Sequence, residues 1–95
     1  MDVTGNPLIV DAADVVAGPV TVWKGAVHVL QVEFQKYTSD ADICVLNRLN
    51  GKPFWNGNGA SDLSTVRSGN VGWTVDGLVV PQGGVTNGSM RIYIK

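Results

Sequence analysis

The sequence predicts an all-β protein, folded as a two-layer antiparallel β-sandwich or jelly roll of about seven to eight short strands. Short runs rich in valine and isoleucine are separated by Asn-Gly, Asp-Gly and Gly-Gly pairs, which lie at 50–51, 56–57, 58–59, 76–77, 83–84 and 87–88. Glycine, asparagine and aspartate tolerate the positive φ that tight reversals need. The chain has 95 residues, which suits one domain with one core.

Composition and charge exclude several classes of protein. Hydrophobic residues make up 44% of the chain and charged residues 16%, which is too apolar for disorder. Seven basic residues stand against eight acidic ones without a block of either sign, so we expect no nucleic acid partner. No segment approaches the roughly 20 apolar residues that span a bilayer, and no signal peptide is recognisable, so we expect no membrane partner. Cys44 is the only cysteine, which excludes an intrachain disulfide and favours intracellular assembly.

Residues 1–19 are expected to form an N-terminal arm and a first short strand, followed by the β-sandwich at 20–95. Met1–Pro7 is polar and has no periodic pattern, which is typical of an arm or a mobile terminus. Asp11–Ala17 could form one helical turn, but its adjacent valines and the following Gly-Pro pair favour a short strand or turn.

The next segments alternate between apolar and polar residues. Val20–Trp23 predicts a strand that ends at Gly25. Ala26–Gln35 predicts a long strand whose inward phase changes, because Val27 and Val29 share one side whereas Leu30, Val32 and Phe34 share the other. Such a switch indicates a bulge or a strand buried on both faces.

The middle of the chain predicts a strand and then a long loop. Asp42–Leu49 carries apolar residues on both faces, which favours a central strand. Asn50–Ser61 predicts a long connection or wide hairpin end that encloses Phe54 and Trp55, and Leu63–Arg67 predicts a short strand.

The C-terminal third predicts a hairpin and a final strand. Asp76-Gly77 favours a type I′ turn between strands at 72–75 and 78–80. Ser89–Lys95 has a period of two, which places Met90, Ile92 and Ile94 on one buried face.

No pattern selects a catalytic, cofactor-binding or metal-binding set, so we expect no enzyme, no cofactor and no metal. His28 is the only histidine, and one chain cannot build an ordinary zinc site with it. Cys44 occupies an apolar strand and is expected to pack as a small hydrophobe. Glu33 alternates with core positions and is expected to point outward, and no spacing pairs it with another carboxylate.

The aromatic residues are the best candidates for a binding surface. Phe54 and Trp55 are adjacent in a segment rich in Asn and Gly, so both cannot easily enter the core. Exposed aromatics beside amides stack on sugar rings or anchor protein interfaces, and one ring could instead cap the open end of the sandwich. The interface candidates are Phe54, Trp55, Asn56, Asn58, Trp23 and Tyr93.

Several segments together resemble a known family. They are the N-terminal arm, Val20–Gly25 (VTVWKG), the strand at Val27–Phe34, Ile43–Leu46 (ICVL), the aromatic and Gly/Asn-rich loops, and Met90–Ile94 (MRIYI). This arrangement resembles the small β-sandwich structural proteins of tailed bacteriophages, particularly the decoration or cement proteins that sit on capsid shells as dimers or trimers.

The resemblance implies a non-enzymatic virion protein that binds across major-capsid subunits and stabilises the shell. It implies a homodimer or homotrimer on the capsid surface, assembled in the host cytoplasm, with the major capsid protein or another virion protein as partner. The alternative is a carbohydrate-binding or receptor-binding β-module, associated with a tail or fibre, that uses exposed aromatics.

Overall fold

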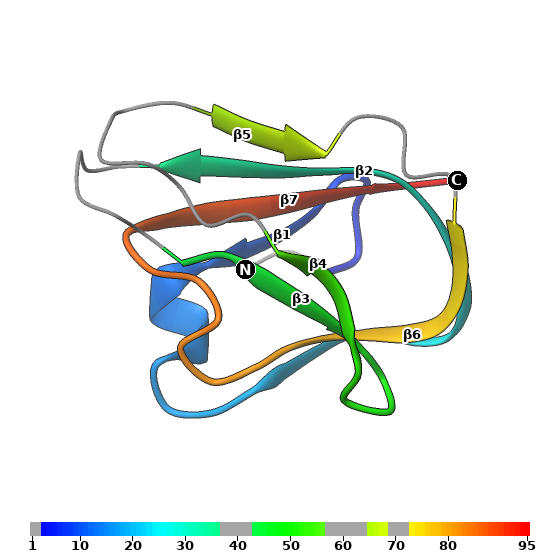
Figure 1. Ribbon diagram of the computed structural model, residues 1–95, viewed down its shortest axis with the longest axis horizontal. Coiled ribbons are helices and arrows are strands. Elements are labelled where there is room, and N and C mark those ends of the chain that lie inside the picture. The colour runs from blue at the N-terminus through cyan, green and yellow to red at the C-terminus, as the bar shows by residue number, and fades with distance from the viewer. Residues whose placement is uncertain (1–2, 37–42, 57–64, 69–72) are drawn as a thin grey trace.

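The fold is antiparallel β throughout, apart from one short 3-10 helix, as the computed structural model shows for residues 3–36, 43–56, 65–68 and 73–95 (Figure 1). The strands are β1 (Leu8–Asp11), β2 (Val20–Lys36), β3 (Val45–Arg48), β4 (Pro53–Asn56), β5 (Thr65–Ser68), β6 (Trp73–Val80) and β7 (Gly88–Ile94), and the helix is η1 (Ala12–Val15). The all-β prediction is confirmed.

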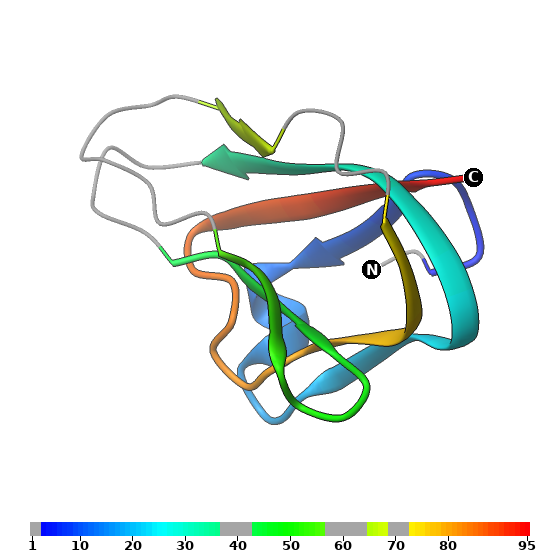
Figure 2. The ribbon, with the colours of Figure 1, turned by 45° about the vertical axis from the view of Figure 1, so that its right-hand side comes forward.

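One continuous sheet runs in the order β1-β7-β2-β6-β3-β4, and β5 pairs with β2. The long strand β2 belongs to two groups of strands. Its first part pairs with β6 from Val20 to Val29, and its second part pairs with β7 from Val29 to Lys36 and with β5 from Val32 to Gln35. Figure 2 shows β2 and β6 bending together round one side of the molecule, so the sheet curls over its own apolar face.

A bulge in the middle of β2 explains the change of inward phase. The pairing with β7 shifts register between Val29 and Gln31, which leaves Leu30 as the extra residue. Val29 and Val32 on either side of it are fully buried, whereas Leu30 is 37% exposed. The prediction of a bulge is confirmed, but the inward position given to Leu30 is wrong, because the bulged residue turns away from the core.

The predicted strand end at Gly25 is wrong, because β2 continues through it. The β2–β6 register shifts between Lys24 and Val27, and Gly25 has φ of 97°. A glycine inside a strand often marks a bulge. Here it lets the strand absorb an extra residue and bend without ending.

The predicted hairpin at Asp76-Gly77 is also wrong, because Trp73–Val80 is one unbroken strand. Gly77 does have a positive φ, of 144°. A Cβ atom at this position would lie 2.8 Å from the Leu49 Cβ and 3.0 Å from the Trp23 carbonyl oxygen. The glycine serves a close approach between neighbouring strands, which is the other common reason for a glycine inside a strand.

The predicted loop at Asn50–Ser61 contains a strand. Asn50-Gly51 forms a tight turn, and β4 then pairs antiparallel with β3, with Trp55 opposite Leu46. Residues 57–61 of the predicted loop, and residues 63–64 of the strand predicted at Leu63–Arg67, lie outside the described residues. The strand that follows them is β5, at Thr65–Ser68.

The strand predicted at Asp42–Leu49 is shorter and buried on one face only. An isolated bridge joins Cys44 to Val85, and β3 begins at Val45. Cys44 and Leu46 are fully buried, but Ile43 is 46% exposed and Leu49 is 47% exposed. Although β3 lies between β4 and β6 in the sheet, the residues that flank it carry exposed apolar side chains.

The N-terminal segment is fastened to the sheet by side-chain hydrogen bonds. Asn6 Nδ2 donates to the Ile94 carbonyl oxygen at 2.7 Å, and the Ile94 N–H donates to Asn6 Oδ1 at 3.0 Å. The strand or turn predicted at Asp11–Ala17 is instead the 3-10 helix η1, preceded by β1. The Asp11 N–H donates to Asp14 Oδ2 at 2.8 Å, a local bond that favours the turn of helix over extended backbone.

The final strand confirms the period-two pattern, since Met90 and Ile92 are fully buried and Ile94 packs against the core. The buried apolar side chains of the described residues form one core. It comprises Leu8, Val10, Val15, Val22, Val27, Val29, Val32, Phe34, Cys44, Leu46, Val75, Leu78, Val80, Val85, Met90 and Ile92.

Candidate binding site

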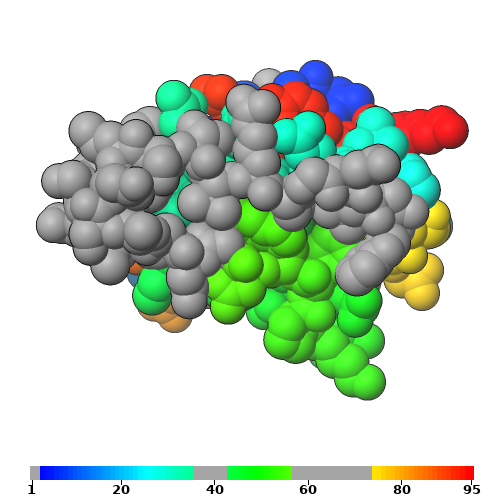
Figure 3. Space-filling model, turned by 45° about the horizontal axis from the view of Figure 1, so that its top comes forward, coloured from blue at the N-terminus to red at the C-terminus, as the bar shows by residue number. Residues whose placement is uncertain are grey.

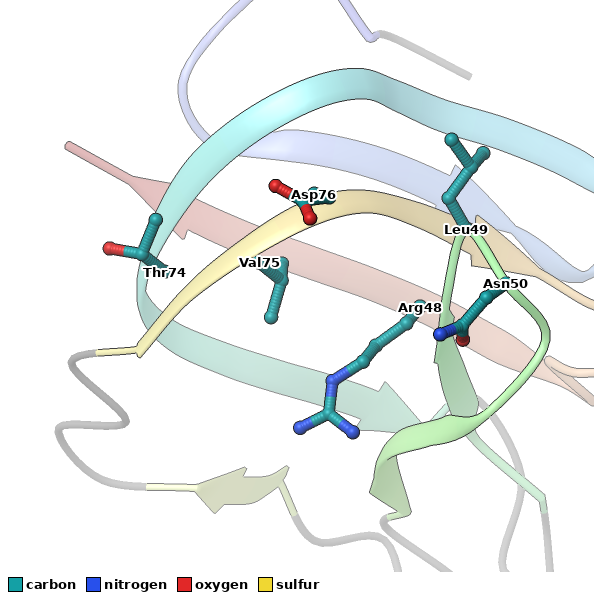
Figure 4. Close-up of a pocket in the computed structure, with 6 residues that line it drawn as sticks. All are labelled: Arg48, Leu49, Asn50, Thr74, Val75 and Asp76. Atoms are coloured by element: carbon teal, nitrogen blue, oxygen red, sulfur yellow. The ribbon is translucent and has the colours of Figure 1, made fainter.

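An open pocket of about 590 Å³ lies between the β3–β4 turn and β6 (Figure 4). We call it the Arg48 pocket. Its described lining residues are Arg48, Leu49, Asn50, Thr74, Val75 and Asp76. Figure 4 shows Arg48 and Asn50 reaching from the β3–β4 side into the space beside Val75, while Thr74 and Asp76 project from the opposite side of β6.

The turn between β3 and β4 fixes one wall of this pocket. The Gly51 N–H donates to the Arg48 carbonyl oxygen at 2.9 Å, and the Arg48 N–H donates to the Lys52 carbonyl oxygen at 2.8 Å. The Lys52 N–H donates to Asn50 Oδ1 at 3.0 Å. Because its oxygen is engaged within the turn, Asn50 presents its amide nitrogen as the group available to a ligand.

The Arg48 guanidinium lies over the Phe54 ring, with its carbon 5.7 Å from the ring centroid. This cation–π contact holds the half-buried side chain in place. Among the residues that the structure describes, none accepts a hydrogen bond from the guanidinium. Arg48 therefore faces the pocket with its hydrogen-bond donors available.

The β6 wall adds polar groups. Thr74 Oγ1 lies 3.0 Å from His28 Nδ1, and His28 is the strand partner of Thr74 on β2. The contact fixes the position of the Thr74 oxygen, and the ring tautomer of His28 decides which of the two groups donates. Asp76 is exposed, and Val75 between them is buried.

Close packing beside Gly77 holds Leu49 at the pocket. The Leu49 N–H donates to the Gly77 carbonyl oxygen at 3.2 Å, so the turn after β3 is anchored on β6. Without a side chain on Gly77, Leu49 can rest against the β6 backbone. The pocket thus combines a guanidinium, a carboxylate, an amide and a hydroxyl with two apolar side chains.

The predicted interface residues lie in different parts of the sheet. Phe54 and Trp55 are half-buried on β4 and pack against the core, and Asn56 is exposed at the end of that strand. Trp23 is half-buried on β2, and Tyr93 is half-buried on β7 opposite Gln31. Asn58 lies outside the described residues.

The sheet register relates only some of these residues to the pocket. Leu78 on β6 pairs with Trp23 on one side and with Arg48 on the other. Together with the Arg48–Phe54 contact, this brings two of the predicted aromatics near the pocket, whereas Tyr93 belongs to the β2–β7 pairing. Sequence reasoning missed Arg48, Asn50, Thr74 and Asp76. The Asn50-Gly51 turn signal was the one available indication of where they would meet.

Cys44 is fully buried, and burial raises the pKa of its thiol well above the ordinary value, which keeps it protonated. Glu33, expected to point outward, is only 6% exposed, so that expectation is wrong. It lies opposite Arg91 on β7, with 3.7 Å between Arg91 Nη1 and Glu33 Oε1, and the ion pair offsets part of the cost of burying its charge.

A second hollow, of about 470 Å³, lies between η1 and the β6–β7 connection. Val16 borders it and is 71% exposed, and Gln82 Nε2 donates to the Val16 carbonyl oxygen at 3.1 Å. This hollow contains no charged side chain among its described lining residues. It is an uncharged hollow separate from the Arg48 pocket.

No protein-family model matches this chain, and neither a curated protein nor a solved structure was found to be similar to it. Within residues 3–36, 43–56, 65–68 and 73–95, no three His, Cys, Asp or Glu side chains gather in a way that could hold a metal ion. In the same part of the chain, no helix has the length and hydrophobicity needed to cross a bilayer.

Proposed function

We propose that this chain is a structural attachment protein that binds other macromolecules through the β3–β4 hairpin. The observation that carries the proposal is a set of apolar side chains at one projecting hairpin: Leu49, nearly half exposed, with Phe54 and Trp55, both half-buried. We call these three residues the hairpin surface. Figure 3 shows the hairpin, in green, standing out from the body of the molecule. Partly buried aromatics of this kind anchor protein interfaces.

The family resemblance gives the attachment function a setting. We propose that the chain decorates the capsid of a tailed bacteriophage, where it binds the major capsid protein or another virion protein as a homodimer or homotrimer. Affinity would come from many identical contacts on a symmetric lattice. Since β2 pairs with β6 in one half and with β7 and β5 in the other, we also propose that the two groups of strands are the layers of a β-sandwich or jelly roll.

Co-sedimentation with capsids of the phage that encodes the chain tests attachment. We expect the wild-type chain to sediment with capsids, and Leu49→Asp to reduce the bound fraction about tenfold or more, because a charge would be desolvated in the contact. Val16→Asp is the matched control, since it places the same charge on an exposed valine outside the hairpin surface, and it should bind like wild type.

Two further measurements keep this test decisive. Circular dichroism and the melting temperature show whether each variant is folded. Lys52→Glu changes an exposed charge in the same turn without touching the core, and it should also weaken attachment if the hairpin is the contact. A wild-type chain that never sediments with capsids, or that stays monomeric at every concentration, would contradict the proposal.

The Arg48 pocket favours a second candidate function, that of a carbohydrate-binding or receptor-binding module. Its volume lies within the range of small-molecule sites, and its mixed polar and apolar lining suits a hydroxylated ligand. Titration with a panel of mono- and disaccharides, followed by tryptophan fluorescence, tests it, with Asn50→Ala, a change in the pocket lining that keeps every tryptophan, as the variant expected to weaken binding. A panel that produces no saturable change would remove this candidate.

A further inference from the structure

We propose that the Arg48 pocket binds the carboxylate group of a sugar acid, such as a hexuronate. The inference rests on the second candidate function, because it assigns a ligand class to the carbohydrate site. It does not depend on capsid attachment.

The Arg48 guanidinium is held in place but has no acceptor in the part of the chain that the structure describes. It is half-buried, it is held by the Phe54 ring, and none of its hydrogen-bond donors has an acceptor among the described residues. A planar guanidinium held in one orientation is matched by a planar oxyanion that accepts two parallel N–H bonds. A ligand carboxylate supplies both acceptors.

The charge of the pocket favours a carboxylate over a phosphate. The described lining holds one cation, Arg48, and one anion, Asp76, so its formal charge is balanced. A phosphate close to two negative charges would have a single cationic partner and would be repelled by Asp76. A carboxylate carries a single charge, so Asp76 repels it less than a phosphate while it still pairs with Arg48.

The other groups that line the pocket suit a hydroxylated ring. The Asn50 amide nitrogen can donate to a ring hydroxyl beside Arg48, whereas Thr74 and Asp76 border the pocket from the other side of β6. Val75 borders the same space as Arg48 and Asn50 and offers its apolar side chain to the C–H groups of the ring. A simple aliphatic acid would use Arg48 but leave these polar groups without partners.

The experiment titrates the full-length chain with D-glucuronate and with D-glucose, which differ at one carbon. Amide chemical shifts report both the affinity and the location of binding. We expect glucuronate to bind at least about tenfold more tightly than glucose, since the charged pair is present in only one of them. Shifts should centre on residues 48–50 and 74–76.

Matched variants locate the charge that matters. Arg48→Lys keeps the cation but removes the planar fork, and Arg48→Gln removes the charge. We expect a loss of about tenfold or more with each. Lys52→Gln removes the neighbouring exposed cation of the same turn and should change affinity by less than about twofold. Amide spectra of the free variants confirm that the fold is retained.

The outcomes separate this inference from the function on which it rests. Preferential glucuronate binding that Arg48→Lys abolishes supports both. Equal binding of glucose and glucuronate, unaffected by Arg48→Gln, overturns the inference but keeps the carbohydrate function. Binding of neither sugar overturns the inference, and the saccharide panel then decides the carbohydrate function separately. Binding of an acidic peptide in place of glucuronate, at the same residues, also overturns the inference and assigns the pocket to a protein partner.

Discussion

The two halves of β2 differ in how directly their sequence determines their pairing. In the second half, β7 follows a clean period of two, and its pairing with β2 contains one register shift, at Leu30. In the first half, the pairing with β6 contains two register shifts and a positive-φ glycine on each strand, Gly25 and Gly77. The first half is also where the pocket forms, beyond the point where β3 pairs with Leu78 and Val79 of β6.

This difference shows that glycine has two structural roles in a β-rich chain. In a turn, glycine supplies positive φ to a reversing chain. In the β2–β6 half, it supplies positive φ and a missing side chain to strands that continue. Asp76-Gly77 carries the signal of a hairpin turn, yet Gly77 lies inside a strand and receives Leu49 from the neighbouring turn.

The largest difference in stability is expected between two substitutions in the half of β2 that pairs with β7. Phe34→Ala should lower the free energy of unfolding by about 3–5 kcal/mol, because Phe34 is a fully buried aromatic. Leu30→Ala should cost less than about 1 kcal/mol, because the bulge places Leu30 at the surface. Denaturation in urea measures both. Similar losses from the two variants would contradict the bulge.

In the β6 half, Gly77→Ala should destabilise the fold by about 2–4 kcal/mol. The added methyl group would meet the Leu49 Cβ and the Trp23 carbonyl oxygen, at a φ that favours glycine. Gly18→Ala is the matched control, because a Cβ atom there has open space around it, and it should stay within about 0.5 kcal/mol of wild type. Thermal unfolding distinguishes them. If Gly77 were in a type I′ turn at the surface, the methyl group would not meet Leu49.

A smaller effect is expected where the N-terminal segment joins β7. Asn6→Ala removes both hydrogen bonds to the Ile94 backbone and should cost about 1 kcal/mol. Amide hydrogen exchange at Ile94 should accelerate at the same time. Asn56→Ala, an exposed asparagine at the end of β4, is the control and should leave the Ile94 amide unchanged. Unaltered exchange in Asn6→Ala would show that the segment is held by other contacts.

The smallest effect concerns the Cys44 thiol, on the β6 side of the sheet. Burial raises its pKa above the ordinary value of 9.0, so the thiolate is scarce in the native state at neutral pH and remains so as the pH rises to 9. Reaction with a thiol reagent should be slow until denaturant is added. Stoichiometric labelling of the native protein within minutes would show that this part of the core opens readily.

The sequence predicted those elements whose burial alternates regularly, and it failed where backbone geometry departs from the ideal. The β7 pattern and the phase switch in β2 were visible because valine, isoleucine and phenylalanine record which side faces the core. By contrast, η1 depends on the local bond between Asp11 and Asp14, which short-range propensity did not reveal.

The candidate site was predicted only in part, for a similar reason. Phe54 was singled out as an aromatic, but its partner Arg48 lies across the turn, and the pocket wall at Thr74 and Asp76 comes from a strand that pairs with β3 through a long-range contact. Charged and polar residues at strand ends carry no periodic signal. Where these residues meet depends on the pairing register of β3 and β6. That register requires β6 to be one continuous strand, which was not predicted.

The length of β2 makes unfolding of the protein cooperative. Since this one segment of 17 residues forms hydrogen-bonded ladders with β5, β6 and β7, neither half of the sheet can melt while leaving the other intact. Calorimetric and van 't Hoff enthalpies should therefore agree in a heating scan. Under a pulling force, the trace should show a single rupture.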